Sequence, residues 1–271
     1  MKPDTPPAPV PASTVIIGRD RPGGIEVFMV LRNEKSDFAS GALVFPGGKV
    51  DEADKLPGIR PLCDGAEGVD NAMLWTMVAA IRETFEESGI LLARNGDDST
   101  MVSGPRLALL DSYREPLNTG ELSLADFLKK ENLKLACDQL TFFAHWITPE
   151  MVPKRFDTRF FLARAPEGQN GLHDGTESVD SIWISARDAI GSYQNGNYFI
   201  MFPTRMNIQK LGRNQTMDEA IEATRSSSVI TVHPWVEERE AGPALCIPEE
   251  AGYGITAESL EAVMGLKPSA S

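Results

Sequence analysis

Residues 82–90 read RETFEESGI, and they close the amphipathic stretch that decides the fold of this 271-residue chain. Apolar side chains recur at helical spacing through residues 72–88, and Asp70 or Asn71 is placed as the N-cap. Gly89 comes next, and glycine most easily adopts the left-handed conformation that ends a helix. The pattern therefore predicts a helix over residues 72–88.

Three carboxylates, those of Glu83, Glu86 and Glu87, share one side of this predicted helix, opposite an apolar stripe. A solvated outer face is the simplest interpretation of such a cluster. The cluster lies at the helix C-terminus, however, where the helix dipole disfavours anions. A bound divalent cation would relieve that repulsion, and oxygen ligands suit Mg²⁺ or Mn²⁺. Arg82 precedes Glu86 by four positions and is placed to pair with it, unless it forms an ordinary exposed helix pair.

A second motif, FPGG at residues 45–48, ends a short predicted strand over residues 42–45. Pro46 and Gly47 suit the central positions of a type II turn, and Gly47 and Gly48 expose their backbone without side-chain obstruction. Residues 49–71 are then polar, rich in Gly and Pro, and without periodicity. They predict a long loop, of the kind that is either functional or disordered.

Together the two motifs resemble the signature of the Nudix hydrolases, in which a glycine and an acidic residue precede Arg-Glu-apolar-x-Glu-Glu-x-Gly-apolar. Residues 82–90 match the second half, although Thr84 stands where the family prefers an apolar residue. Counting from Gly48 places Asp54 at the first acidic position, but 27 residues separate it from Arg82 where the signature has seven. The box is therefore split by an insertion.

The split box, with WITP at residues 146–149 and RFDTRFF at residues 155–161, resembles the subgroup that contains the mammalian peroxisomal coenzyme A diphosphatases. The resemblance covers roughly residues 15–211. It implies an α+β fold, the Nudix α/β/α sandwich of a mixed sheet flanked by helices, here with a helical insertion and a C-terminal extension.

The resemblance also implies the site residues. Glu83, Glu86 and Glu87 are expected to carry the metal ions, Gly47 to add a carbonyl ligand, and Arg82 to act in catalysis by holding Glu86. Glu177 lies six residues before Trp183 and is the candidate general base, with an ordinary surface glutamate as the alternative interpretation.

The expected substrate-binding residues are Arg32, Arg155, Arg159 and Gly48. Arg32 belongs to a segment that partly matches a coenzyme A motif of the family. Arg155 and Arg159 would share one face of a strand and could bind phosphates as bidentate donors, or else pair with the acidic surplus of the chain.

The chain divides into three predicted parts. Residues 1–12 form a disordered lead, and residues 213–271 form an extension packed on the domain. Residues 13–212 form the Nudix domain, with an insertion at about 55–71 and a helical interlude at about 105–135 that holds helices over 106–114 and 124–131. Other predicted strands cover residues 14–18, 25–32, 140–147, 155–164, 182–184 and 229–232, and helices are expected after Ser185, Thr216 and Thr256.

The composition limits the possible partners. A net charge of −13 and a pI near 4.8 argue against a protein that binds nucleic acid non-specifically, and no apolar run is long enough to predict a membrane span. Three widely spaced cysteines suggest neither disulfides nor a thiolate metal site, so a cytoplasmic location is expected. The expected partner is a small-molecule nucleotide, and a homodimer is compatible with the sequence.

The expected activity is hydrolysis of a diphosphate linkage in a nucleoside-diphosphate derivative, dependent on Mg²⁺ or Mn²⁺. Coenzyme A or acyl-coenzyme A is the first-choice substrate, with NADH and ADP-ribose as alternatives. A hypothesis of another class is a nucleotide-sensing module that keeps the fold and binds without turnover.

Overall fold

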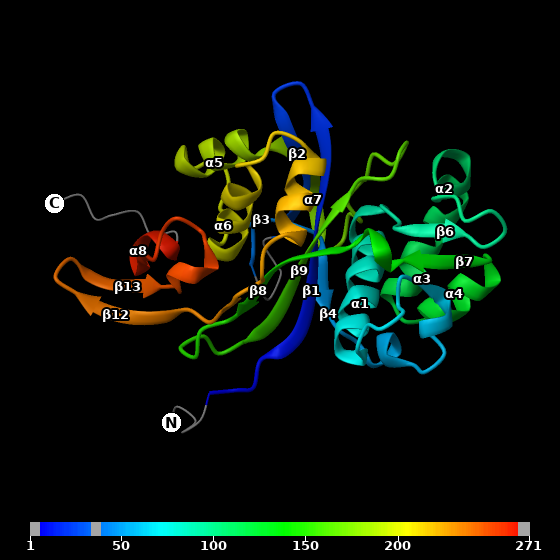
Figure 1. The fold of residues 1–271 in the computed structure, drawn as a ribbon, viewed down its shortest axis with the longest axis horizontal. Coiled ribbons are helices and arrows are strands. Elements are labelled where there is room, and N and C mark those ends of the chain that lie inside the picture. The colour runs from blue at the N-terminus through cyan, green and yellow to red at the C-terminus, as the bar shows by residue number, and fades with distance from the viewer. Residues whose placement is uncertain (1–5, 34–38, 265–271) are drawn as a thin grey trace.

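A mixed β-sheet with helices on both faces forms the centre of the protein in the computed structural model, which describes residues 6–33 and 39–264 (Figure 1). The strand order is β10-β2-β1-β9-β8-β11, with β3 beside β2 and β4 beside β1. These strands are β1 (Val10–Arg21), β2 (Gly24–Arg32), β3 (Leu43–Val44), β4 (Gly47–Lys49), β8 (Thr141–Ile147), β9 (Phe156–Arg164), β10 (Ser178–Ser185) and β11 (Thr231–Val232). The predicted α/β/α arrangement is confirmed.

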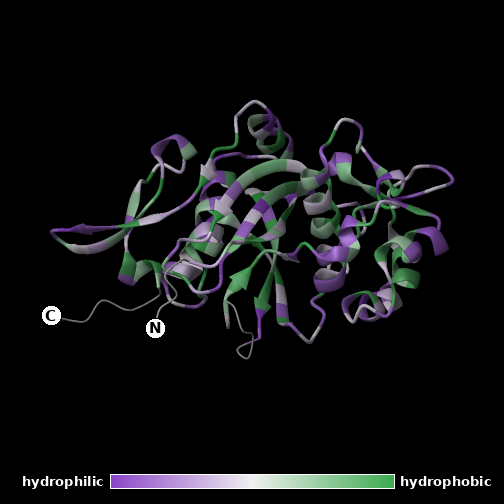
Figure 2. Cartoon of the chain, turned by 90° about the horizontal axis from the view of Figure 1, so that it is seen from below, coloured by the Kyte–Doolittle hydropathy of each residue, from purple (hydrophilic) through white to green (hydrophobic). Residues whose placement is uncertain are grey.

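Each face of the sheet has its own apolar core, because successive side chains of a strand point to opposite faces. Val15 and Ile17 of β1 pack in the core beneath α1 (Asn71–Ser88), whereas Ile16 packs in the core on the other face. The second core is covered by α5 (Ala186–Gln194), α6 (Phe202–Leu211) and α7 (Met217–Arg225). Figure 2 shows the hydrophobic stretches of the central strands between these layers.

The strand β1 begins earlier than the sequence predicts. Val10 donates its N–H to the carbonyl of Arg155 over 2.9 Å, and residues 10–12 pair in parallel with β9. The predicted disorder of residues 1–12 is therefore wrong for residues 10–12. This pairing with β9 satisfies the backbone N–H and C=O groups of residues 10–12. The Pro/Ala-rich composition of the segment does not reveal such pairing.

Residues 55–70 and 93–136, together called the insertion below, fold into a small layer of their own beside α1, on the right in Figure 1. The insertion holds α2 (Gly104–Leu110), α3 (Arg114–Asn118), α4 (Leu124–Lys130) and a three-stranded sheet in the order β5-β7-β6, made of β5 (Cys63–Asp64), β7 (Leu133–Ala136) and β6 (Ala93–Asn95). The helices expected over 106–114 and 124–131 are present as α2 with the start of α3 and as α4, whereas β7 ends the interlude as a strand. The segment 55–71 is ordered, because Ile59 and Cys63 are buried in the core beneath α1.

The C-terminal extension packs on the domain through α7 and through Tyr253, whose hydroxyl donates to Asn207 and accepts from the Trp146 indole. It also forms a second small sheet of β12 (Trp235–Arg239), β13 (Gly242–Cys246) and β14 (Ala257–Ser259), followed by α8 (Leu260–Val263). The β12–β13 hairpin projects from the body in Figure 1. No sequence pattern predicts this hairpin or α6, and the helix expected after Thr256 begins only at Leu260. Within the described residues, no helix has the length and apolar character of a membrane span.

Helix α1 has the predicted ends. The Asp70 side chain accepts from the N–H of Met73, and Gly89 has φ of 68°, in the left-handed region. The simplest interpretation of its acidic side, a solvated face, is wrong: Glu86 and Glu87 are buried, as are Thr76, Ala79 and Ala80. Burial of both sides follows from the loop and strand β4, which cover the face that an isolated helix would expose to water.

Replacing Asp70 with Ala should lower the free energy of unfolding by about 1 kcal/mol, because the first turn of α1 loses its side-chain acceptor. Urea unfolding measures this loss. Asp70→Asn keeps an acceptor and is the matched control, so equal losses for the two variants would contradict the capping role.

Candidate functional site

The two halves of the split box are joined by a buried ion pair between Asp54 and Arg82. Asp54 is completely buried, and its two carboxylate oxygens accept from Arg82 Nε at 2.8 Å and Arg82 Nη2 at 2.9 Å. Asp54 Oδ2 also accepts from the N–H of Asp51, which fixes the carboxylate on the short 3-10 turn Glu52–Lys55. Burial disfavours the charged guanidinium, yet the Asp54 hydrogen bonds raise the pKa of Arg82 above its usual range.

The same guanidinium reaches the acidic end of α1. Arg82 Nη1 donates to Glu86 Oε2 at 2.9 Å, as the spacing predicts, and to Glu83 Oε1 at 3.1 Å. Its Nη2 also donates to the Lys49 carbonyl at 3.1 Å. A single arginine therefore connects Asp54, two box glutamates and the end of β4.

Burial strongly perturbs the three box glutamates. It raises the pKa of Glu83 to about 7 and of Glu86 and Glu87 to about 8, although Arg82 lowers the first two and Arg32 lowers the third. Glu86 Oε1 is buried without any hydrogen-bond partner. The positive charges of Arg82 and Arg32 therefore do not neutralise all of the carboxylates in this cluster.

The glycine motif lies directly against these carboxylates. Gly47 donates its N–H to Glu87 Oε2 at 2.9 Å. A side chain at Gly48 would collide with Glu83, since a Cβ there would lie 2.3 Å from Glu83 Oε1. A larger residue at Gly48 would therefore displace the Glu83 carboxylate from its present position.

Arg32 and Glu177 complete the rim of the cluster. Arg32, at the end of β2, has Nη1 3.4 Å from Glu87 Oε1, and its Nη2 donates to Glu177 Oε2 at 3.1 Å. Glu177 lies on a turn held by Asp174, whose carboxylate accepts from the backbone N–H groups of Glu177 and Ser178. The structure thus brings Glu177 to the box, on the far side of Arg32 from Glu87.

The other two predicted arginines lie elsewhere. Arg155 donates to the carbonyls of Thr148 and Pro7, and its third nitrogen lies 3.2 Å from His233 Nε2. Arg159 pairs in the sheet with Ser13, the strand neighbour of Gly48, so it lies two strands from the glycine motif. No contact joins either arginine to the box glutamates within residues 6–33 and 39–264.

The insertion supports the end of α1. Arg114 of α3 donates to the carbonyl of Glu86 at 3.1 Å and to that of Leu172 at 3.0 Å. It therefore satisfies one of the carbonyls that a helix leaves open at its C-terminus and ties that end to the segment before Glu177. No sequence motif marks Arg114 for this role.

The acidic cluster fits a divalent cation by its chemistry. Three carboxylates, one of them with an orphaned oxygen, and a neighbouring glycine backbone are oxygen donors of the kind that Mg²⁺ and Mn²⁺ prefer. No three acidic, His or Cys side chains of the described residues are already arranged around a common point as a metal cage. Instead, Arg82, Arg32 and the Gly47 N–H contact the carboxylates. Binding would therefore require small rearrangements of Glu83, Glu86 or Glu87.

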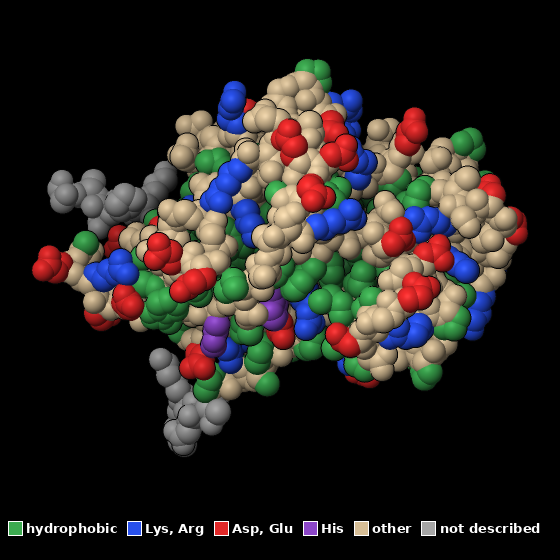
Figure 3. Space-filling model, in the orientation of Figure 1, with side chains coloured by type: hydrophobic (Ala, Val, Ile, Leu, Met, Phe, Trp, Pro, Cys, Tyr) green, Lys and Arg blue, Asp and Glu red, His purple; other side chains and the backbone are tan. Residues whose placement is uncertain are grey.

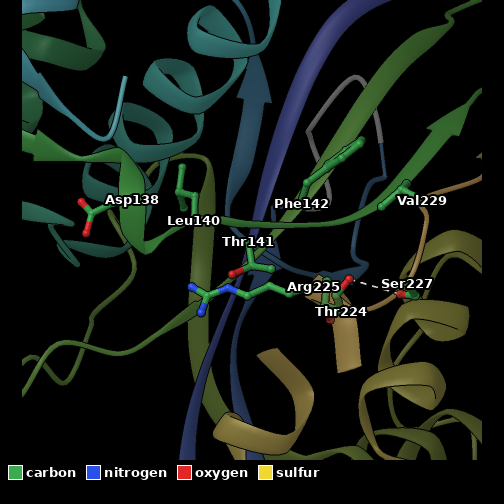
Figure 4. Close-up of a pocket in the computed structure, with 8 residues that line it drawn as sticks. All are labelled: Asp138, Leu140, Thr141, Phe142, Thr224, Arg225, Ser227 and Val229. Atoms are coloured by element: carbon green, nitrogen blue, oxygen red, sulfur yellow. Dashed lines mark hydrogen bonds between the residues drawn. The ribbon is translucent and has the colours of Figure 1, made fainter. Parts of the chain in front are cut away.

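Two surface cavities flank the central sheet. One, of about 480 Å³, lies beside Arg32 at the end of β2. The other, of about 530 Å³, lies between the start of β8 and the end of α7, where the Arg225 side chain extends toward Thr141 (Figure 4). It contains none of the predicted site residues. In Figure 3, hydrophobic side chains gather in the hollow between the insertion and the C-terminal half.

Known proteins resemble both the sequence and the fold. The family model described as NUDT19 Nudix domain matches residues 67–211. A crystal structure of a NUDIX hydrolase from Alicyclobacillus acidocaldarius is 28% identical, with a TM-score of 0.70, over 82% of this chain and 98% of that one. The match of the family model begins after FPGG and Asp54, so the loop half of the box is supported here by geometry.

Curated relatives share lower identity. Putative nudix hydrolase 7 of Caenorhabditis elegans is 27% identical over 71% of this chain and 57% of its own length. The acyl-coenzyme A diphosphatase NUDT19 of Xenopus laevis is 24% identical over 69% of this chain and 59% of its own length, and the human protein of that name is 25% identical over 72% and 63%. The chain thus spans about three fifths of the length of these relatives.

Asp54→Asn should lower the free energy of unfolding by about 3 kcal/mol, because Arg82 would keep its buried charge without its buried charged partner. Asp51→Asn is the matched control: its exposed carboxylate lies 3.4 Å from the same guanidinium and should contribute less than about 1 kcal/mol. Urea unfolding compares them. Similar losses would show that burial of the pair is not what stabilises the loop.

The metal-free protein should lose stability between pH 5 and pH 8. In the unfolded chain these glutamates ionise near their ordinary value of 4.5, whereas burial keeps Glu83 protonated to about pH 7 and Glu86 and Glu87 to about pH 8. The folded state thus holds more protons in this window, so raising the pH favours unfolding. Thermal melts in a chelator measure the trend.

Adding Mg²⁺ at pH 8 should restore the lost stability, and Glu87→Gln should flatten the pH dependence in the chelator. A metal-free stability that rises from pH 5 to pH 8 would contradict the raised pKa values. Carboxyls with lowered pKa, such as Asp20 and Asp138, titrate below this window and do not obscure it.

Proposed function

The chain belongs to the Nudix family described as NUDT19 Nudix domain, and on that premise we propose that it is a metal-dependent hydrolase of the diphosphate linkage in a nucleoside-diphosphate derivative. The observation that carries the proposal is the cluster of Glu83, Glu86 and Glu87, in which Arg82 contacts Glu83 and Glu86 while the Gly47 N–H and Arg32 contact Glu87. Gathering three carboxylates in one place, two of them buried, is unfavourable unless a cation neutralises them.

In this proposal Glu83, Glu86 and Glu87 hold Mg²⁺ or Mn²⁺, with Gly47 as a further backbone ligand. When bound, such an ion lowers the pKa of coordinated water and neutralises charge on phosphoryl oxygens. The orphaned Glu86 Oε1 and the raised pKa values support this assignment, since both reflect a shortage of positive charge. Arg82 is a positioning residue, because it fixes the orientation of Glu86 from the side of Asp54.

The reaction requires one water and no oxidant or reductant. The water oxygen forms a bond to one phosphorus, the bond from that phosphorus to the bridging oxygen breaks, and the bridging oxygen leaves with the other phosphate. Glu177 is the proposed acceptor of the water proton, supported by its place across Arg32 from Glu87. Two phosphorylated products result.

For substrate binding we propose Arg32 and the backbone of Gly48, which both border the acidic cluster. Arg32 has five donors in a planar arrangement and suits a phosphate. Arg159 stays a weaker proposal because it lies two strands away. Arg155 has its three nitrogens engaged by the chain, which favours a structural role over the predicted binding role.

Coenzyme A or acyl-coenzyme A is the first-choice substrate, supported by the relatives named acyl-coenzyme A diphosphatase. NADH and ADP-ribose are the alternatives, since each contains a diphosphate linked to a nucleoside. The proposed location is a reducing compartment such as the cytoplasm, which agrees with the three buried free cysteines. A nucleotide-sensing module is the competing hypothesis, and the complete set of box glutamates argues against it.

Purified protein with Mg²⁺ should hydrolyse at least one of coenzyme A, acetyl-coenzyme A, NADH and ADP-ribose, as measured by chromatography of the products. Glu87→Gln should lower kcat by two or more orders of magnitude, because the site loses a metal ligand. Glu121→Gln, at an exposed position in the insertion, is the matched control and should retain wild-type kcat.

The outcome decides between the two classes of function. If kcat/KM is far higher for one compound than for the other three, that compound is identified as the preferred substrate. If the protein binds a nucleotide but hydrolyses none of the four compounds, the result favours the nucleotide-sensing module. Full activity of Glu87→Gln would show that the metal assignment is wrong.

A further inference from the structure

A row of cross-strand neighbours leads from the acidic cluster across the central sheet. Gly48 of β4 lies beside Ser13 of β1, and Ser13 lies beside Arg159 of β9. Arg159 in turn lies beside His145 of β8. Neighbours of this kind point to the same face of a sheet. Because Gly48 faces Glu83 of α1, the row lies on the face that α1 covers in part.

Arg159 has no partner within the described parts of the chain. Its side chain is half-buried, yet no hydrogen bond, ion pair or ring contact of residues 6–33 and 39–264 engages the guanidinium. The hydroxyl of its neighbour Ser13 is buried and also lacks a hydrogen-bond partner. Partial burial of an unpaired charge is unfavourable, and the chain has an excess of acidic residues, with a net charge of −13. An anionic ligand would supply the missing partner.

His145 engages the only carboxylate that β9 carries. Asp157 lies two positions before Arg159 and shares its face of the strand. Its Oδ1 contacts His145 Nε2, and the other ring nitrogen of His145 lies 2.8 Å from Thr231 Oγ1. Asp157 therefore pairs with the histidine, and no ion pair joins it to Arg159 in the described structure. The guanidinium donors of Arg159 stay available to a ligand.

The position of Arg159 suits an anionic group separate from the diphosphate. Helix α1 packs on β1 and β4, whereas Phe142, His145 and Arg159 of the two following strands stay partly exposed. Figure 3 shows basic and His side chains among the hydrophobic ones of the hollow between the insertion and the C-terminal half. Neighbouring strands lie about 4.8 Å apart, so the backbone of Arg159 lies about 10 Å from that of Gly48. A second anionic group of a substrate held at the cluster fits this separation.

We propose that Arg159 binds a phosphate monoester of the substrate, separate from the diphosphate linkage that lies at the acidic cluster. The inference rests on the proposed function, since it presupposes a nucleotide held at the cluster. A planar guanidinium binds a phosphate with two parallel N–H groups. The ligand class is a nucleoside-diphosphate derivative with a third phosphate on its ribose. Coenzyme A carries this group, whereas NADH and ADP-ribose lack it, so Arg159 is a specificity-determining residue.

Hydrolysis of a matched pair of substrates tests the inference. For the wild type, kcat/KM should be higher for coenzyme A than for 3′-dephospho-coenzyme A on the order of tenfold or more, the effect of hydrogen bonds to a charged group. Arg159→Gln should abolish this preference by raising KM for coenzyme A, with kcat nearly unchanged. Arg164→Gln is the matched control, because it removes the same charge from the other end of β9, where Arg164 pairs with Asp20 and Asp218. It should keep the wild-type preference.

A binding measurement tests the same site without turnover. Adenosine 3′,5′-bisphosphate and adenosine 5′-monophosphate contain no diphosphate linkage and differ only in the additional phosphate. In calorimetric titrations with Mg²⁺, the wild type should bind the bisphosphate more tightly on the order of tenfold, and Arg159→Gln should bind both alike. If Arg159→Gln does not fold, Arg159→Lys keeps the charge without the paired N–H groups and should lose part of the preference.

Three results would overturn the inference: a wild type that binds the two nucleotides equally, an Arg159→Gln variant that keeps the wild-type preference, or Arg159-dependent binding of inorganic phosphate without any preference between the nucleotides. The proposed hydrolysis fails separately. Tighter binding of the bisphosphate through Arg159, without turnover of any diphosphate, would support the phosphate site and contradict the hydrolase. Equal kcat/KM for coenzyme A and its dephospho form would support the hydrolase and contradict the phosphate site.

Discussion

The buried pair between Asp54 and Arg82 is the interaction on which the site depends. Asp54 is removed completely from water, and Arg82 alone donates to both of its oxygens from another part of the chain. The two residues are 28 positions apart, so the pair closes a loop that contains the whole segment 55–71. Removing one partner would leave a charge in a region without water. The pair therefore determines where α1 lies relative to the glycine motif.

A shortage of positive charge follows from that placement. Asp54, Glu83 and Glu86 are brought together around Arg82, and Glu87 lies beside Arg32 at the rim. Two arginines do not balance these carboxylates, and burial raises the pKa of the three glutamates toward or above neutrality. Protons and divalent cations consequently compete for the same oxygens. The excess of carboxylates over arginines at this position would stabilise a bound cation, and the cation in turn would stabilise a phosphate group.

Segments outside the box shape the surroundings of the cluster. Arg114 of the insertion holds the carbonyl end of α1, Asp174 holds the turn before Glu177, and Phe199 fixes the wall of the neighbouring cavity to β3. None of the three belongs to a recognisable motif. They act through long-range contacts, so segments outside the box determine what surrounds the acidic cluster.

The sequence by itself determined the local structure: α1 with its Asp70 cap and Gly89 end, the β1–β2 hairpin, the caps at Ser185 and Thr216, and the Arg82–Glu86 pair. These features depend on residues at most a few positions apart, so spacing is enough to reveal them. Only the tertiary structure decided that Asp54 meets Arg82, that the acidic side of α1 is largely buried, that Arg155 binds backbone carbonyls, and that Arg32 contacts both Glu87 and Glu177. Such contacts depend on how loops close over tens of residues, and periodicity carries no information about that closure.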